Sequence, residues 1–202
     1  MKPGVIRTFA VLGIIGGILQ FLNVFFDEYV LGLDKMAHDV TIGVIDLVSA
    51  ILIVIGLIAL LAFHEKPGKN LLVSFLVLFF GMSLFIGFKY VESFALPMLY
   101  EHARPLAEDP PSPAQEGIMV TFMLFALSWL YFGISLLIKR QLPIAGAIIA
   151  MIGPIADFIP IDFGIQIAPE VWGIGIVWLS LAVFRGSKAS DAPLDRSGAV
   201  ST

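Results

Sequence analysis

The stretch VTIGVIDLVSAILIVIGLIALLAF (40–63) contains a single charged residue, Asp46. About 20 apolar residues are enough to carry an α-helix across the roughly 30 Å hydrocarbon core of a bilayer. We therefore predict a transmembrane helix over 40–63. Comparable apolar runs occur elsewhere and bring the predicted spans to six, the others being 5–26, 70–90, 118–138, 142–161 and 168–185.

The composition supports a membrane protein, and six spans leave no room in the chain for a second folded domain. Hydrophobic residues make up 58% of the 202-residue chain, whereas about 45–50% is usual for soluble domains. Because backbone polar groups that face lipid must be satisfied within their own segment, helices are expected. We predict an all-α polytopic protein, with one six-helix bundle over 1–186 and a disordered cytoplasmic tail over 187–202. The segment 158–170 is interpreted as an interfacial turn or a re-entrant loop.

Lysine and arginine are distributed unevenly between the two ends of the predicted spans. Most fall at one end: Lys2, Arg7, Lys66, Lys69, Lys139, Arg140, Arg185, Lys188 and Arg196. At the other end lie Lys35, Lys89 and Arg104. Short cytoplasmic loops carry an excess of these residues, so both termini are expected in the cytoplasm. Most acidic residues fall on the predicted outer side. The net charge of −4 therefore combines a basic cytoplasmic face with an acidic outer face.

Several classes of function lack their sequence signals. The chain has no cysteine, which removes disulfides, thiolate catalysis and Cys-ligated clusters. Hydrolase, zinc-protease and phosphate-loop motifs are absent, as is the basic stripe on a soluble surface that nucleic-acid binding requires. No histidine spacing marks a metal site. We predict no catalytic residue, no metal and no cofactor.

Small residues on two predicted helices indicate close packing. Gly13, Gly16 and Gly17 on the first span are expected to face another helix rather than lipid, because glycines let helix backbones approach closely. On the second span, Asp46 shares a face with small and polar residues, namely Ser49, Ala50 and Gly56. Asp46 is therefore expected to point into the bundle.

Polar residues gather near the outer ends of the predicted spans, within roughly 5–10 Å of them at 1.5 Å of rise per residue. The candidate ligand-binding set is Gln20, Asn23, Asp46, Lys89, Glu92 and Asp157. An intramembrane carboxylate is a functional candidate that needs a partner. For Asp46 we expect that partner to be Lys89, or the amides of Gln20 and Asn23. The set either lines an outward-opening polar cavity for a small molecule or cation, or ties helix ends together.

Two stretches carry a resemblance to known proteins. These are ESFALPML (92–99), which leaves the third span, and FALSWLYFGISLLIKRQLPIAGAIIAMIGPI (125–155). Together they resemble small bacterial multi-pass membrane proteins of uncharacterised function. The resemblance implies a six-helix protein of the bacterial inner (plasma) membrane, and it implies no activity and no site residue.

Three functions remain open at this point. The first is a non-enzymatic protein that binds a small or lipid-like ligand, or a partner, from the outer side. The second is a small transporter or transporter accessory subunit that uses Asp46 and Asp157. The third is an intramembrane enzyme in which these two aspartates form a carboxylate pair. A separation of the two below about 6 Å favours an active or ion site, because catalysis requires hydrogen-bond reach.

Overall fold

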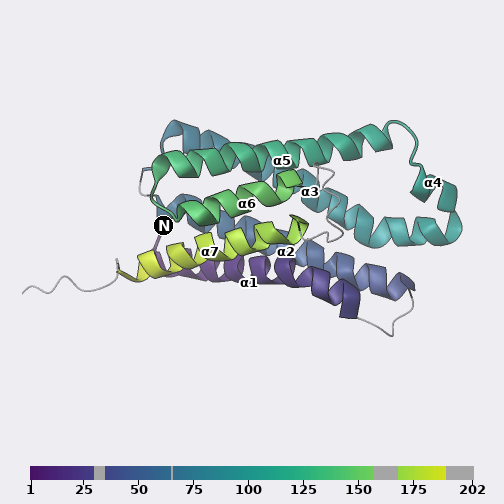
Figure 1. Cartoon of the computed structure of the whole chain (residues 1–202), viewed down its shortest axis with the longest axis horizontal. Helices are drawn as coiled ribbons and strands as arrows, with labels where there is room; N and C mark the ends of the chain where they lie inside the picture. Colours follow the sequence, from purple (N-terminus) through teal and green to yellow (C-terminus); the bar gives the residue numbers. More distant parts are fainter. Residues whose placement is uncertain (30–34, 65, 157–167, 190–202) are drawn as a thin grey trace, which may run out of the picture.

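The computed structural model describes residues 1–29, 35–64, 66–156 and 168–189. Within these ranges the chain forms helices and no strand (Figure 1). The helices are α1 (Pro3–Tyr29), α2 (Lys35–Phe63), α3 (Lys69–His102), α4 (Arg104–Glu108), α5 (Ala114–Lys139), α6 (Ile144–Ala156) and α7 (Ala168–Ala189). The predicted all-α class is confirmed.

Four of these helices contain segments long and apolar enough to cross a membrane. They are Pro3–Asn23, Ala37–Phe63, Lys69–His102 and Ala114–Lys139. Two shorter apolar segments, Ile144–Ile155 and Val171–Ser187, lie in α6 and α7. Several large apolar side chains on α3 and α5 are more than half exposed, as expected of surfaces that face lipid; among them are Leu76, Phe80, Leu127 and Ile138.

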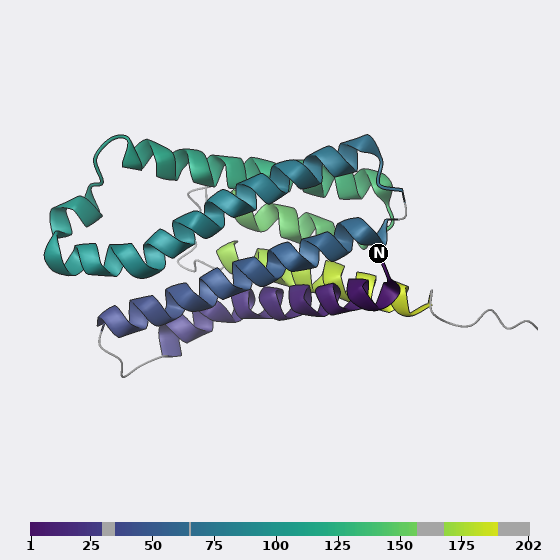
Figure 2. The same cartoon turned by 180° about the vertical axis from the view of Figure 1, so that it is seen from behind.

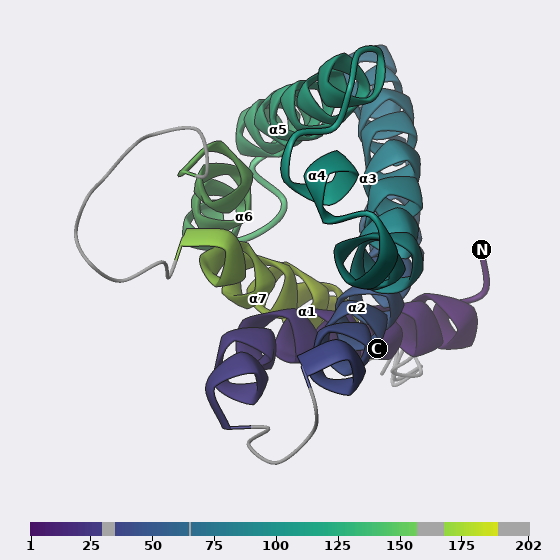
Figure 3. The ribbon, with the colours of Figure 1, turned by 90° about the vertical axis from the view of Figure 1, so that its right-hand side faces the viewer.

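The long helices pack as an uneven ring. Neighbouring pairs are α2 and α3, α3 and α5, α5 and α6, and α6 and α7, while α1 packs against both α2 and α7. Figure 3 shows this arrangement end-on, with α1 below α2 and α7. In Figure 2, α3 runs obliquely between α5 and α2. This course brings the C-terminal half of α3 beside the N-terminal half of α2.

Three of the four glycines of α1, namely Gly13, Gly16 and Gly17, lie at direct backbone contacts, which confirms their predicted orientation. A Cβ atom placed on Gly13 would lie 2.8 Å from the Cα of Gly56 in α2. One placed on Gly17 would lie 2.7 Å from the carbonyl oxygen of Gly173 in α7. Gly16 would clash in the same way with the backbone of Ser49 and Ile53. Small residues therefore hold α1 tightly between two helices.

Aromatic side chains fill the interior between α3, α5 and α7. Phe85 and Phe125 stack with ring centroids 4.2 Å apart, and Trp172 meets Phe125 edge-on at 5.7 Å. Trp129 lies 5.3 Å from Trp172 and is 1% exposed. This aromatic cluster, defined as Phe85, Phe125, Trp129 and Trp172, joins α3, α5 and α7 within the hydrophobic core.

Two predicted boundaries need correction. Helix α3 continues past the span predicted over 70–90 to His102, and its 34 residues amount to about 51 Å at 1.5 Å per residue. Helix α7 extends to Ala189, so residues 187–189 are helical rather than part of a disordered tail. Ser187 is buried there, and its carbonyl oxygen accepts a 2.9 Å hydrogen bond from Arg7. The rest of the predicted tail, and the segment 158–167, lie outside the described residues.

Candidate functional site

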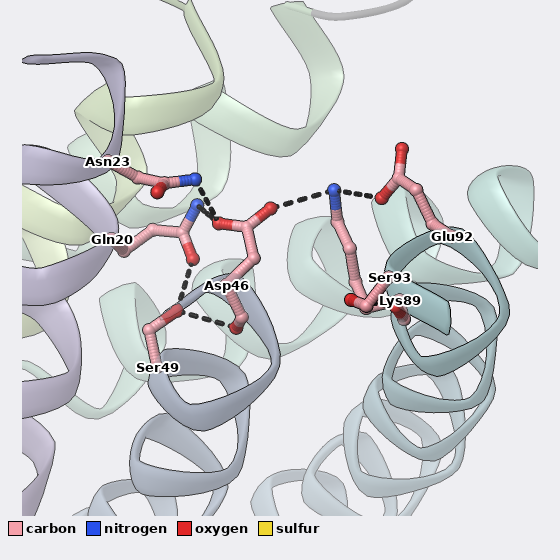
Figure 4. A network of polar contacts seen from close by, with 7 residues as sticks. All are labelled: Gln20, Asn23, Asp46, Ser49, Lys89, Glu92 and Ser93. Atoms are coloured by element: carbon pink, nitrogen blue, oxygen red, sulfur yellow. Dashed lines mark hydrogen bonds and ion pairs between the residues drawn. The ribbon is translucent and has the colours of Figure 1, made fainter. Parts of the chain in front are cut away.

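Five of the six residues in the predicted set come together from three helices (Figure 4). Helix α1 supplies Gln20 and Asn23, α2 supplies Asp46, and α3 supplies Lys89 and Glu92. The sixth, Asp157, lies outside the described residues, so the expected comparison of its distance from Asp46 stays a prediction.

Asp46 is the centre of this network and is 8% exposed. Its Oδ1 accepts hydrogen bonds from Asn23 Nδ2 at 2.7 Å and from Gln20 Nε2 at 3.3 Å. Its Oδ2 lies 2.8 Å from the Nζ atom of Lys89. The inward orientation of Asp46 is confirmed, and the two alternative sets of partners are both present. A carboxylate removed from solvent is stable only with such compensation.

Ser49 belongs to the network but was not in the predicted set. Its hydroxyl lies 2.7 Å from Gln20 Oε1 and 2.8 Å from the carbonyl oxygen of Asp46, and can donate to either. When it donates to Gln20 Oε1, the amide is oriented with its Nε2 toward Asp46. The sequence signal was the position of Ser49, three residues after Asp46 and on the same helical face.

Lys89 connects the buried end of the network to a solvent-exposed end. Besides Asp46, its Nζ contacts Glu92 Oε2 at 2.6 Å. The same ammonium lies 5.6 Å from the ring centroid of Phe85, within range of a cation–π interaction. Glu92 has a side-chain exposure of 39%, against 11% for Asp46. One cation therefore bridges a buried carboxylate and an accessible one.

A cavity of about 290 Å³ opens beside this bridge, between the N-terminal half of α2 and the C-terminal half of α3. Its lining comprises Asp39, Ile42, Gly43, Asp46, Lys89, Glu92, Leu96, Pro97 and Tyr100. The two helices meet closely at its base, where a Cβ atom on Gly43 would overlap the side chain of Ser93. Glycine at position 43 thus permits the approach that brings Asp46 and Lys89 together.

The arrangement combines charge with an apolar wall. Three carboxylates, one ammonium and one phenol face the cavity together with Ile42, Leu96 and Pro97. Among the described residues, no three His, Cys, Asp or Glu side chains are placed to hold a metal ion. Both oxygens of Asp46 are occupied by protein partners. This chemistry suits reversible binding of a small polar molecule with an organic part.

Neither a protein-family model, nor a curated protein, nor a solved structure matches this chain. The resemblance to small bacterial multi-pass proteins therefore stays a prediction. What the protein does is inferred below from the geometry of the Asp46–Lys89–Glu92 bridge and the cavity beside it.

Proposed function

We propose that the chain is a six-span protein of a bacterial plasma membrane, with both termini in the cytoplasm, that binds a small ligand from the outer side in the α2–α3 cavity. Four helices are long and apolar enough to cross a membrane, and α6 and α7 add two shorter apolar segments. In this proposal the ligand is held without being chemically converted.

The orientation is supported by charge and by contacts at the end of the bundle opposite the cavity. Lysines and arginines concentrate at that end, which the positive-inside rule assigns to the cytoplasm. The hydrogen bond from Arg7 to Ser187 brings the start of α1 beside the end of α7. The α2–α3 turn and the end of α5 meet there too, since a Cβ on Gly68 would lie 3.1 Å from Lys139 Nζ.

The observation that carries the binding proposal is the position of the buried ion pair at a cavity. Buried ion pairs contribute little net stability because both charges lose their hydration. A pair that only tied α2 to α3 would need no open space beside it and no additional acids. Asp39 and Glu92 nevertheless face the same cavity and are partly exposed, at 41% and 39% of their side chains.

The side chains that surround Asp46 favour binding over transport and over catalysis. A transport route would need Asp46 to be released from its partners, yet its carboxylate is buried against Asn23, Gln20 and Lys89, and Lys89 also lies over the ring of Phe85. An enzyme using Asp46 as general acid or base would need one of its oxygens within reach of substrate. Those oxygens instead contact Asn23, Gln20 and Lys89.

Cysteine accessibility tests this proposal, because the natural chain has no cysteine. Single variants Tyr100→Cys, Leu96→Cys and Lys66→Cys are treated with a membrane-impermeant maleimide in intact and in permeabilised cells. We expect labelling of the first two in intact cells and of Lys66→Cys only after permeabilisation. Leu78→Cys, at a position with 0% exposure, is the matched control and should resist labelling throughout.

Two outcomes of that experiment would contradict the proposal. Labelling of Lys66→Cys in intact cells would reverse the orientation. Failure of Leu96→Cys to react in either preparation, while Tyr100→Cys reacts, would mean that the cavity is closed to molecules from the outer side.

A further inference from the structure

We infer that the α2–α3 cavity selects an organic ammonium: a small molecule whose positive nitrogen binds the acidic side chains and whose carbon skeleton lies on the apolar wall. This inference rests on the proposed binding function and specifies the chemical class of its ligand.

The first argument is the balance of charge in the cavity. Asp39, Asp46 and Glu92 bring three negative charges, whereas Lys89 brings one positive charge. That positive charge is already shared between two carboxylates, with Nζ 2.8 Å from Asp46 and 2.6 Å from Glu92. An anionic ligand would find Lys89 engaged and the remaining acids repulsive. A cationic ligand would relieve the excess of negative charge.

The second argument is that the protein already binds one ammonium, that of Lys89, with two carboxylates and an aromatic ring. Lys89 Nζ sits between two carboxylates and over the face of Phe85. The cavity lining also contains the carboxylate of Asp39, whose Oδ1 lies 3.5 Å from His38 Nδ1, and the side chain of Tyr100. Figure 4 shows the second oxygen of Glu92 pointing away from Lys89. A ligand ammonium in the cavity could bind this oxygen of Glu92 by a charge-assisted hydrogen bond, with aromatic and acidic side chains elsewhere in the lining.

The third argument separates an organic cation from a metal ion. Ile42, Leu96 and Pro97 make part of the wall apolar, and an apolar wall does not coordinate a hydrated ion. It does accommodate a short hydrocarbon skeleton, whose burial adds affinity. Such an ammonium has two sources: a free amine, or the ethanolamine headgroup of a lipid in the outer leaflet.

Three probes of similar size and different charge test the inference on the full-length protein in nanodiscs of ethanolamine-free lipid. They are phenethylammonium, 2-phenylethanol and 3-phenylpropionate, and isothermal titration calorimetry measures their dissociation constants. We expect saturable binding of the ammonium and at least about tenfold weaker binding of the other two, from the charge interactions alone. Equal or tighter binding of the alcohol or the carboxylate would overturn the inference, and so would no binding of the ammonium.

Amide variants identify the acids responsible. Glu92→Gln and Asp39→Asn keep the shape of the side chain and remove its charge, and each should weaken phenethylammonium binding about tenfold. Glu101→Gln is the matched control: its side chain is 60% exposed, it lies outside the cavity, and its removal should leave the affinity unchanged. A further variant, Leu96→Trp, fills the cavity and should abolish binding. Unchanged affinity in all of these variants would place the probe elsewhere and overturn the inference.

The source of the ammonium is decided by changing the lipid. Adding ethanolamine lipid to the nanodiscs should lower the apparent affinity for phenethylammonium if headgroups occupy the cavity, and leave it unchanged if the ligand is a free amine. Failure of the inference is distinguishable from failure of the proposed function. If Leu96→Cys is labelled from outside while no ammonium binds, the cavity is accessible as proposed and only the inferred class of its ligand is wrong.

Discussion

The Nζ atom of Lys89 lies 2.8 Å from Oδ2 of Asp46, and this ion pair joins α3 to α2 where both side chains are largely withdrawn from solvent. Neither charge would be tolerated alone at this position, because each has lost most of its hydration. The pair is therefore a specific tie between two helices, and its two members should respond to substitution as one unit.

Replacing Lys89 by methionine should destabilise the protein by about 3–5 kcal/mol, the usual effect of leaving a buried charge unpaired. Adding Asp46→Asn to this variant should restore more than half of the loss, because the amide oxygen introduced at position 46 still accepts from Asn23. Unfolding in mixed micelles measures both quantities. Additive losses in the double variant, or a Lys89→Met protein as stable as the natural one, would show that the two side chains are not coupled.

Substitutions of Asp46 alone distinguish its structural role from its role in ligand binding. Asp46→Asn keeps an acceptor for Asn23 and Gln20, whereas Asp46→Leu leaves both amides without one. We expect the leucine variant to be less stable than the asparagine variant by about 1–3 kcal/mol, the penalty of an unsatisfied buried group. The asparagine variant should fold yet bind phenethylammonium more weakly. Equal stability of the two variants would mean that the hydrogen bonds contribute nothing.

A pair of glycine-to-alanine substitutions tests the helix contacts. On Gly56 the new Cβ would lie 2.5 Å from the Cα of Gly13, and overpacking of this kind destabilises by about 1–3 kcal/mol. On Gly87 it would meet nothing within 4 Å, and alanine should stabilise the helix by about 0.5–1 kcal/mol. Thermal unfolding in detergent should therefore shift in opposite directions. Shifts of the same sign and size would mean that α1 and α2 are further apart.

The network around Asp46 was largely predictable because charged side chains within a membrane span must be paired with polar groups. A carboxylate within an apolar run has to face the bundle and find a polar partner, and Lys89, Gln20 and Asn23 are polar residues at the matching depth. The glycines of α1 were predictable for a related reason, since closely packed helices in lipid favour small residues. Both inferences required only helical spacing and the depth of each residue in the membrane.

A polar cavity was predicted as one of two alternatives, but its apolar and aromatic lining was not, because Leu96, Pro97 and Tyr100 lie beyond the span predicted over 70–90. A proline inside a helix usually interrupts it, so the sequence alone did not show that one regular helix continues through Pro97. Once α3 runs through Pro97 to His102, helical spacing places Lys89, Leu96 and Tyr100 on one face. Asp39 was missed similarly, because α2 starts at Lys35 rather than at residue 40. Tertiary packing extended both helices beyond the apolar runs.

His64, at the cytoplasmic end of the bundle in the proposed orientation, is a separate source of pH dependence. It follows the last residue of α2, is 4% exposed, and its Nδ1 lies 2.9 Å from the carbonyl oxygen of Leu60. Among the described residues, its Nε2 is buried without a hydrogen-bond partner. Burial lowers the pKa of His64 below 6.5 and the charge of Lys139 lowers it further, while the hydrogen bond to Leu60 opposes them.

Because the folded protein takes up this proton less readily than the unfolded chain, acid should favour unfolding. The stability associated with neutral His64 is fully present above pH 6.5, the ordinary value, and is lost as the pH falls from there toward the lower pKa of the folded state. His64→Gln keeps a donor for Leu60 and does not titrate. We therefore expect the unfolding midpoint of the natural protein to fall more steeply below pH 6.5 than that of the variant, with parallel curves above it. Parallel curves over the whole range would mean that His64 is as readily protonated in the folded protein as in the unfolded chain.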